Sequence, residues 1–358
     1  MSKSIHLAGL NGLRAIAALT VMWGHVFLGV FGYWGIDCHV RTFFPLDGVT
    51  LFFVVSGFLI TYLILNEKDQ TGGISVKKFY IRRILRIWPL YYAYLIVALI
   101  VTKETFGTEL LYYIFFGANI PFALGIALWP VVHYWSLGVE EQFYLFWPWV
   151  VKKSTTKKLE YIILAIMFAW IACKLLCWAP EDKSHLYRFF AATRFDCMML
   201  GALGAIFYHR KTRWVLKIAQ NRWVAAISVL LLVFSQWLWL VPAIIQPQIV
   251  ALVSLLAIVG QLTEQKPFIN LENRIMDGIG KISYGIYVIH PLLIYCLSAA
   301  WRKMNFTIDA TLQITIIYVL VTVLTICIAQ LSYRYLERPF LKLKDKYAVV
   351  SSQSSMSK

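Results

Sequence analysis

Charged side chains are scarce in this 358-residue sequence: only 15% of the residues are Asp, Glu, Lys or Arg, whereas 60% are hydrophobic. A soluble globular domain does not have this balance, so the composition predicts a polytopic membrane protein. The apolar runs also lack the alternation of β-barrel strands, which leaves helices as the spanning elements. We therefore predict an all-α fold of membrane-spanning helices.

Acidic residues are scarcer than basic ones, with 18 Asp and Glu against 34 Lys and Arg, a net charge of +16. Such an excess often indicates nucleic-acid binding. Here, however, the basic residues lie in short loops between apolar runs, as the positive-inside rule of membrane proteins describes. We therefore expect membrane lipids as partners, and no nucleic acid.

The cysteine patterns of a disulfide framework or a zinc site are missing too. Of the six cysteines, Cys38 is alone in a loop and the others lie in apolar runs. Cys173 and Cys177 would share a helix face, but no Cys or His set with zinc spacing accompanies them, so we predict no metal site. A cleavable signal peptide is not expected either, because residues 8–31 are too long for its apolar core and no small-residue cleavage site follows.

Ten segments are long and apolar enough to span a bilayer: residues 14–31, 44–65, 87–101, 134–151, 161–178, 191–208, 223–240, 244–262, 278–300 and 312–333. Residues 110–128 are a weaker candidate, because Gly117, Asn119, Pro121 and Gly125 interrupt them. We expect them to form a re-entrant or surface element.

The loops between these spans predict the orientation. One side of the membrane receives both ends of the chain and most of the 34 basic residues, whereas the opposite loops hold only Arg41, Lys103, Lys183, Arg188, Arg302 and Lys303. Both termini are therefore predicted to be cytoplasmic. We expect one transmembrane domain over residues 1–345 and a disordered cytoplasmic tail over residues 346–358, which end in a polar run without aromatic residues.

The first span carries two ionisable side chains, Arg14 and His25. At about 100° and 1.5 Å per residue, the two share one helix face and lie roughly 16 Å apart along it. Arg14 is then near one membrane surface and His25 well inside the bilayer. Ionisable groups at this depth usually face a bundle interior or a wet cavity and mark a functional path. A snorkelling arginine with a hydrogen-bonded structural histidine is the alternative.

Arg82, Arg83 and Arg86 form a basic cluster before the third predicted span. On a helix, Arg86 is a neighbour of both other arginines, so the three guanidinium groups form a patch at the inner membrane surface. Guanidinium groups bind phosphate in a bidentate manner, which suits a phosphorylated cytosolic ligand. A topogenic cluster beside anionic headgroups explains this spacing equally well.

Two later spans carry polar stripes. Ser136, Glu140 and Tyr144 follow one another at intervals of four, so the fourth span presents a hydroxyl, a carboxylate and a phenol on one face near the outer interface. The carboxylate either orients a histidine or a sugar hydroxyl, or it merely reaches interfacial water. In the ninth span, Tyr287 precedes His290, a second histidine in an apolar run.

Arg194 and Asp196 open the sixth span, where Gly201 and Gly204 allow close helix packing. We interpret these two charged residues as a structural polar pair on the outer face. Contact with a substrate that enters from the outer side is the alternative for these two residues. The same alternative applies to Ser136, Tyr144 and Tyr287.

Seven motifs follow one another along the chain: GLRAIAALTVMWGH, LFFVVSGFLIT, FYIRRILRIWPLYY, YWSLGVEEQFYLFWP, RFDCMMLGAL, SYGIYVIHPLL and SYRYLERPF. Together, over residues 10–340, they resemble acyltransferase family 3 of bacterial membrane O-acyltransferases. Members move an acyl group, usually acetyl, from cytosolic coenzyme A across the membrane onto hydroxyls of surface carbohydrates. The resemblance implies acetyl-CoA or another acyl-CoA as the donor, no permanently bound cofactor, and the bacterial inner membrane as the location.

The resemblance also implies roles for single residues. His25 matches the family's catalytic histidine, Glu140 matches the acid of the Trp-Ser-Leu motif, and His290 matches the histidine of the late motif. We therefore expect these three residues to be catalytic.

The donor site follows from the same motifs. Arg83 and Arg86 match the paired arginines that are thought to hold the acyl-CoA phosphates, and we expect Arg14 and Arg82 to act with them. Some family members carry an extracytoplasmic hydrolase-like domain, so a step that needs such a domain is expected to be absent or to come from a separate partner protein.

In the predicted mechanism, the pantetheine arm runs between helices toward His25, which activates the acceptor hydroxyl for attack on the thioester while Glu140 orients the imidazole or the sugar. Burial favours the neutral imidazole that acts as a base. A transient acyl-imidazole is the competing chemistry. The expected acceptor is a carbohydrate, with a lipid-linked O-antigen unit ahead of peptidoglycan, exopolysaccharide and a glycolipid.

Two other functions fit parts of the pattern. Intramembrane histidines and a carboxylate also suit the proton relay of a transporter or exporter of a polar solute, although such proteins more often show an internal repeat with interrupted helices, and none is visible. A carbohydrate-binding sensor would need neither His25 nor the inner arginines. We predict an acyltransferase, with the transporter as the alternative.

Overall fold

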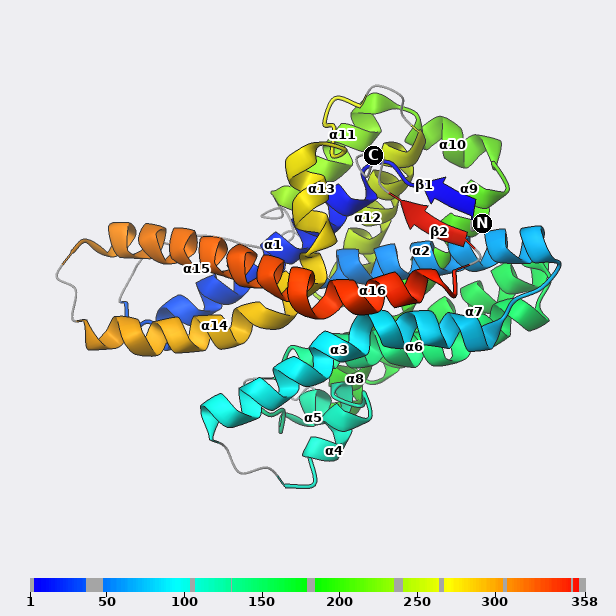
Figure 1. Ribbon diagram of the computed structural model, residues 1–358. Coiled ribbons are helices and arrows are strands. Elements are labelled where there is room, and N and C mark those ends of the chain that lie inside the picture. The colour runs from blue at the N-terminus through cyan, green and yellow to red at the C-terminus, as the bar shows by residue number, and fades with distance from the viewer. Residues whose placement is uncertain are drawn as a thin grey trace.

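The computed structural model describes residues 3–36, 48–103, 107–129, 131–178, 184–234, 241–263, 267–304, 308–348 and 350–353. Almost all regular structure in these residues is α-helix, as long helices joined by short ones (Figure 1). The predicted all-α fold is therefore confirmed.

Eight helices of the described residues are long and apolar enough to cross a membrane, or up to nine if a bent pair counts as one span. The eight are α1 (Leu10–Gly32), α2 (Gly48–Thr71), α3 (Val76–Thr102), α7 (Thr156–Leu176), α8 (His185–Thr193) with α9 (Phe195–His209), α12 (Gln246–Thr263), α14 (Ser283–Lys303), and α15 (Ala310–Ser332), which continues through the π-helical turn η2 (Tyr333–Glu337) into α16 (Arg338–Asp345). The bent pair is α10 (Arg213–Ala219) and α11 (Arg222–Val233), which meet at 67°. The chain is thus a polytopic membrane protein.

Helix α6 (Tyr134–Lys153) is also long enough to be a span, as the sequence predicts, but it is not among those eight. Polar residues such as Glu140 and Glu141 in its middle make α6 less apolar than the eight helices above. With α6 and the bent pair, each of the ten predicted spans overlaps a described helix, although residues 44–47 and 235–240 of two spans lie outside the described residues. Length and apolarity alone support eight or nine spans.

Helix α3 begins earlier than the predicted third span. The apolar pattern predicts a short span that begins at residue 87, after a separate basic stretch. The structure instead has one helix from Val76, capped by Ser75, which accepts a hydrogen bond from the Lys78 amide. The arginine cluster therefore lies on the first turns of a long helix. Residues 110–128 form two short helices, α4 (Leu110–Ile114) and α5 (Asn119–Leu124), and not a span.

The backbones of helices α2 and α9 approach each other closely at two glycines. A Cβ atom at Gly57 would lie 2.0 Å from the carbonyl oxygen of Met198, and one at Gly201 would lie 2.2 Å from that of Val54. Real Cβ atoms do not come so close, so only glycine permits this contact. The close packing predicted for Gly201 and Gly204 is confirmed, with Gly201 against α2 and Gly204 against Leu255 of α12.

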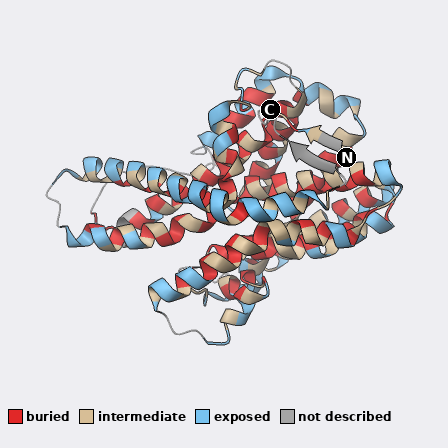
Figure 2. Ribbon diagram, viewed as in Figure 1, coloured by how far each residue is buried: buried red, intermediate tan, exposed pale blue. Residues whose placement is uncertain are grey.

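Burial separates inner helices from outer ones. Helices α1, α2 and α9 are mostly buried, whereas α7 and α15 are exposed along much of their length (Figure 2). The exposed side chains on the outer helices are large and apolar, for example Phe168 and Val319. Such faces suit contact with lipid, and the inner helices are left to position the site.

The two ends of the chain meet on one side of the bundle (Figure 1). Strand β1 (Lys3–His6) pairs in parallel with β2 (Val350–Gln353), and α13 (Arg274–Lys281) packs nearby on the start of α1, where Asn11 donates a hydrogen bond to Asp277. The structure thus corrects part of the predicted disordered tail over residues 346–358. Its strand has a partner at the other end of the chain, which composition does not reveal, and residues 354–358 lie outside the described part.

Candidate active site

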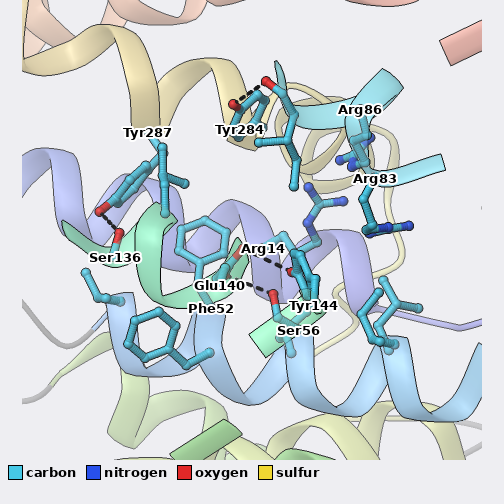
Figure 3. Close-up of a pocket in the computed structure, with 17 residues that line it drawn as sticks. Arg14, Phe52, Ser56, Arg83, Arg86, Ser136, Glu140, Tyr144, Tyr284 and Tyr287 are labelled. Atoms are coloured by element: carbon cyan, nitrogen blue, oxygen red, sulfur yellow. Dashed lines mark hydrogen bonds between the residues drawn. The ribbon is translucent and has the colours of Figure 1, made fainter. Parts of the chain in front are cut away.

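Five helices, α1, α2, α3, α6 and α14, surround one pocket inside the bundle (Figure 3). Much of its lining is apolar, with residues such as Phe52, Phe53 and Ile87. The lining residues that can act chemically are Arg14, Ser56, Arg83, Arg86, Ser136, Glu140, Tyr144, Tyr284 and Tyr287. Most of the residues that the sequence analysis selected therefore meet at one place.

Three of the four arginines predicted to bind acyl-CoA line this pocket. Arg83 and Arg86 come from α3 and Arg14 comes from α1, and Figure 3 shows them at the end of the pocket opposite Tyr287. The Arg83 guanidinium lies 5.7 Å from the centre of the Tyr144 ring, and its Nε has no hydrogen-bond partner among the described residues. Several guanidinium groups held together favour an anionic ligand.

Arg82 lies elsewhere. Its side chain forms an ion pair of 2.9 Å with the buried carboxylate of Glu67, and it donates a second hydrogen bond of 3.0 Å to the carbonyl oxygen of Tyr347. Glu67 also accepts a hydrogen bond from the Ser75 amide. Arg82 thus ties α2, α3 and the segment after α16 together, and it is not among the residues that line the pocket.

Glu337 is a carboxylate near the arginines that the sequence analysis did not select. It is 4% exposed, accepts a hydrogen bond from Ser332, and lies within electrostatic range of Arg86 and Arg14. The turn η2 that carries it is π-helical, a rare geometry that often occurs at functional sites. Its signal in the sequence is the Glu of the SYRYLERPF motif.

Glu140 is held in the middle of the pocket by two hydroxyl groups. Ser56 donates a hydrogen bond of 2.9 Å to one carboxylate oxygen, and Tyr144 donates one of 3.1 Å to the other. The predicted proximity of Glu140 and Tyr144 is therefore confirmed, and Ser56 is an additional partner. In these contacts Glu140 does not orient a histidine, and Arg14 lies beside it (Figure 3).

Ser136 and Tyr287 close the other end of the pocket. Their hydroxyl groups share a short hydrogen bond, and the Tyr287 hydroxyl also donates to the carbonyl oxygen of His133 at 3.1 Å. The Tyr287 ring contacts Phe52 edge-on and lies 6.0 Å from the His290 ring, centre to centre. Tyr287 thus stands between the pocket and the histidines.

His25 and His290, the two predicted catalytic histidines, are in direct contact. The Nε2 atom of His290 lies 3.0 Å from Nδ1 of His25, and the ring centres are 5.0 Å apart. Residues 265 positions apart on α1 and α14 are therefore paired, and neither one lines the pocket itself.

The carbonyl partners of this pair assign its protons. Nδ1 of His25 lies 3.0 Å from the Val21 oxygen, and Nδ1 of His290 lies 2.9 Å from the Ile286 oxygen. A carbonyl oxygen only accepts, so both Nδ1 atoms carry hydrogen, and His25 shares its one Nδ1 hydrogen between the Val21 oxygen and Nε2 of neutral His290. This assignment leaves Nε2 of His25 unprotonated, which is the state that a base or a nucleophile needs.

His133 is a third histidine in this cluster, and the sequence analysis did not select it. It is 2% exposed, and its ring centre lies 5.9 Å from that of His290 and 5.7 Å from that of Tyr287. The only signal in the sequence is its place directly before the YWSL segment of α6. In the described part of the chain, no group of three or more His, Cys, Asp or Glu has the geometry of a metal site.

Arg194 and Asp196 are not paired with each other. Arg194 donates a hydrogen bond of 2.6 Å to Thr50 on α2, whereas Asp196 lies 3.7 Å from the buried ammonium of Lys174 and accepts a hydrogen bond from Gln248. Both residues link helices outside the pocket, which agrees with the structural interpretation but not with the predicted pairing.

These features define a class of protein: a polytopic helical membrane protein whose internal pocket holds arginines and a glutamate beside a histidine pair. The chain belongs to the acyltransferase family that its motifs resemble, because the family model described as "Acyltransferase domain" matches residues 7–334.

Several bacterial proteins are similar to this chain. A protein of Staphylococcus aureus strain COL, whose name provisionally describes an O-acetyltransferase, is 26% identical, over 95% of this chain and 58% of its own length. Peptidoglycan O-acetyltransferase OatA of Listeria monocytogenes is 25% identical, over 94% of this chain and 56% of its own. O-acetyltransferase OatA of Staphylococcus aureus strain NCTC 8325 is 25% identical, over 94% of this chain and 57% of its own length. The chain thus spans a little over half the length of these relatives, and no solved structure matches it significantly.

Proposed function

We propose that this protein is a membrane O-acetyltransferase that moves an acetyl group from cytoplasmic acetyl-CoA to a hydroxyl of a cell-surface carbohydrate. One observation carries the proposal: a single pocket has Arg14, Arg83 and Arg86 at one end and Tyr287, which contacts His290, at the other. Such a site can hold a phosphorylated donor by its nucleotide end while its thioester approaches the histidine pair.

The proposed topology has ten spans, including α6 and the bent pair of α10 and α11, with both termini in the cytoplasm. The parallel pairing of β1 with β2 supports a common side for the two ends, and the excess of basic residues on that side supports the cytoplasm. The proposed location is the bacterial inner membrane.

In the proposed reaction, Nε2 of His25 takes the proton of the acceptor hydroxyl. The hydroxyl oxygen forms a bond with the acyl carbon, the carbon–sulfur bond of the thioester breaks, and the departing thiolate of coenzyme A takes the proton from His25. His290 holds the His25 ring through Nδ1 and stabilises the imidazolium by accepting its hydrogen bond. Glu140, which is bonded to Ser56 and Tyr144, offsets the positive charge of nearby Arg14 rather than orienting His25.

A transient acyl group on Nε2 of His25 is the competing route. The two routes differ in one observable: only the covalent route leaves labelled acetyl on the protein when the acceptor is omitted.

The proposed acceptor is a glycan, and the name of the Listeria relative supports peptidoglycan as the first one to test. Lipid-linked oligosaccharides and exopolysaccharides follow as candidates. If the acetyl group must be passed on to a further acceptor, we propose that a separate extracytoplasmic protein carries out that second transfer.

The proposal is tested by radiolabelled acetyl transfer from acetyl-CoA to a panel of glycans, in membranes that contain the wild type or His25→Ala. We expect label with the wild type and a loss of at least 100-fold with the variant, since a positioned base contributes about 10²–10⁴ in rate. His209→Ala is the matched control, because His209 pairs with Asp69 away from the pocket. Equal labelling by the wild type and His25→Ala would exclude the proposed chemistry.

A further inference from the structure

We propose that His133 binds the acceptor: a ring nitrogen of His133 hydrogen-bonds a hydroxyl of the carbohydrate beside the His25–His290 pair. This inference rests on the proposed function and adds a residue that recognises the second substrate.

The His133 ring is buried, and at least one of its two nitrogens has no hydrogen-bond partner in the described part of the chain. Its residue is 2% exposed, and neither ring nitrogen has a hydrogen bond of good geometry to any described residue, although the Val288 backbone lies close to it. Buried polar atoms are nearly always paired, so an unpaired imidazole inside a membrane domain requires an explanation. A group that enters from outside the chain supplies one.

The neighbours of His133 are already committed to other partners. Its ring centre lies 5.0 Å from that of Tyr134 and 5.5 Å from that of Tyr94. The Tyr134 hydroxyl donates to the carbonyl oxygen of Tyr91 at 2.7 Å, and the Tyr287 hydroxyl is bonded to Ser136 and to the His133 backbone.

His290 is unavailable to His133 as well. One of its ring nitrogens is bonded to the Ile286 oxygen and the other to His25. The protein itself therefore offers His133 no free hydroxyl or imidazole among these neighbours.

The position of the ring favours the acceptor over the donor. His133 stands directly before α6, while the arginines that would hold acyl-CoA lie on the far side of Ser136 and Tyr287 (Figure 3). The ring is not among the residues that line the pocket and lies beside the His25–His290 pair, 5.9 Å from the His290 ring centre.

The chemistry of the imidazole fits a sugar hydroxyl. A neutral histidine offers one donor and one acceptor, and a hydroxyl group also both donates and accepts. A hydroxyl can thus donate to Nε2 of His25 and accept from His133, or a neighbouring hydroxyl of the same sugar can bind His133.

The experiment compares His133→Phe, which keeps an aromatic ring beside Tyr94 and Tyr134, with His133→Gln, which keeps a hydrogen-bonding group. Acetyl transfer to chitopentaose, a soluble N-acetylglucosamine oligomer, is measured against glycan concentration, with peptidoglycan fragments and lipid-linked oligosaccharides as further acceptors. Acetyl-CoA binding is measured separately in the absence of glycan. His185→Phe is the matched control, because this histidine bonds the Ala123 oxygen away from the histidine cluster.

We expect His133→Phe to lower kcat/KM for the glycan at least tenfold while the Kd for acetyl-CoA changes less than twofold, and His133→Gln to recover part of the loss. Wild-type transfer by His133→Phe would overturn the inference and leave the ring with a structural or water-binding role. An equal loss of acetyl-CoA binding would overturn it too, since the ring would then serve the donor side or the fold. A wild type that binds acetyl-CoA but labels no glycan would overturn the proposed function itself, an outcome distinct from a failure confined to His133.

Discussion

Arg82 and Arg83 are adjacent on α3 but lie in different environments. We predict that glutamine substitutions at the two positions have different effects. Arg82 forms an ion pair with Glu67, in which the two side chains are 10% and 3% exposed. Arg83 lines the pocket and leaves its Nε without a hydrogen-bond partner in the described part of the chain. Arg82→Gln should therefore affect folding, and Arg83→Gln should affect donor binding.

The magnitudes follow from burial. Arg82→Gln leaves Glu67 as a buried charge without its partner, a change that typically costs about 3–5 kcal/mol of stability. Arg83→Gln removes a charge-assisted contact to a phosphate, which is worth about 1.5–3 kcal/mol. Since about 1.4 kcal/mol is a tenfold change in Kd, acetyl-CoA binding should weaken roughly ten- to hundredfold.

The assay measures thermal unfolding and acetyl-CoA affinity on the same purified samples of the full-length protein in detergent. We expect Arg82→Gln to unfold at a clearly lower temperature and, below that temperature, to bind acetyl-CoA like the wild type. Arg83→Gln should unfold like the wild type and bind weakly. If Arg82→Gln keeps wild-type stability but loses affinity, the assignment of the two arginines is refuted.

Two further predictions concern helix packing, and thermal unfolding in detergent checks both. Gly201→Ala should destabilise the protein by about 1–3 kcal/mol or more, because its Cβ atom would lie 2.2 Å from the Val54 oxygen, whereas Gly278→Ala meets nothing within 4 Å and should be neutral. Asp196→Asn leaves the buried ammonium of Lys174 without its ion pair and should cost about 3–5 kcal/mol, while Lys174→Met combined with Asp196→Leu should recover much of that loss. An unchanged unfolding temperature for Gly201→Ala or for Asp196→Asn would contradict the respective contact.

The sequence predicts those features that depend on residues close together in the chain, such as helices and contacts along one helix face. Apolar runs predict the helices, and the spacing of Glu140 and Tyr144 predicts their contact on one face of α6. The same local logic fails for the three arginines of α3, because successive residues point about 100° apart on a helix. Which of them faces the pocket depends on Glu67 and Tyr347, which are partners from other elements.

The non-local part of the site is not readable from one sequence. His25 and His290 each occur as an isolated histidine in an apolar run, and only the packing of α1 on α14 brings their rings together. His133 precedes α6 in an irregular segment with no periodic pattern, so nothing marks it as buried. The strand at residues 350–353 is not predictable from its local sequence either, since its pairing partner is at the other end of the chain.

Tyr287 separates the two parts of the site in which the proposed reaction places the donor and the acceptor. Its hydroxyl links α14 to Ser136 and to the backbone of His133, while its ring contacts Phe52 on one side and His290 on the other. The pocket with the arginines ends at this side chain. In the proposed reaction, an acyl group that reaches His25 from the arginine side therefore passes Tyr287.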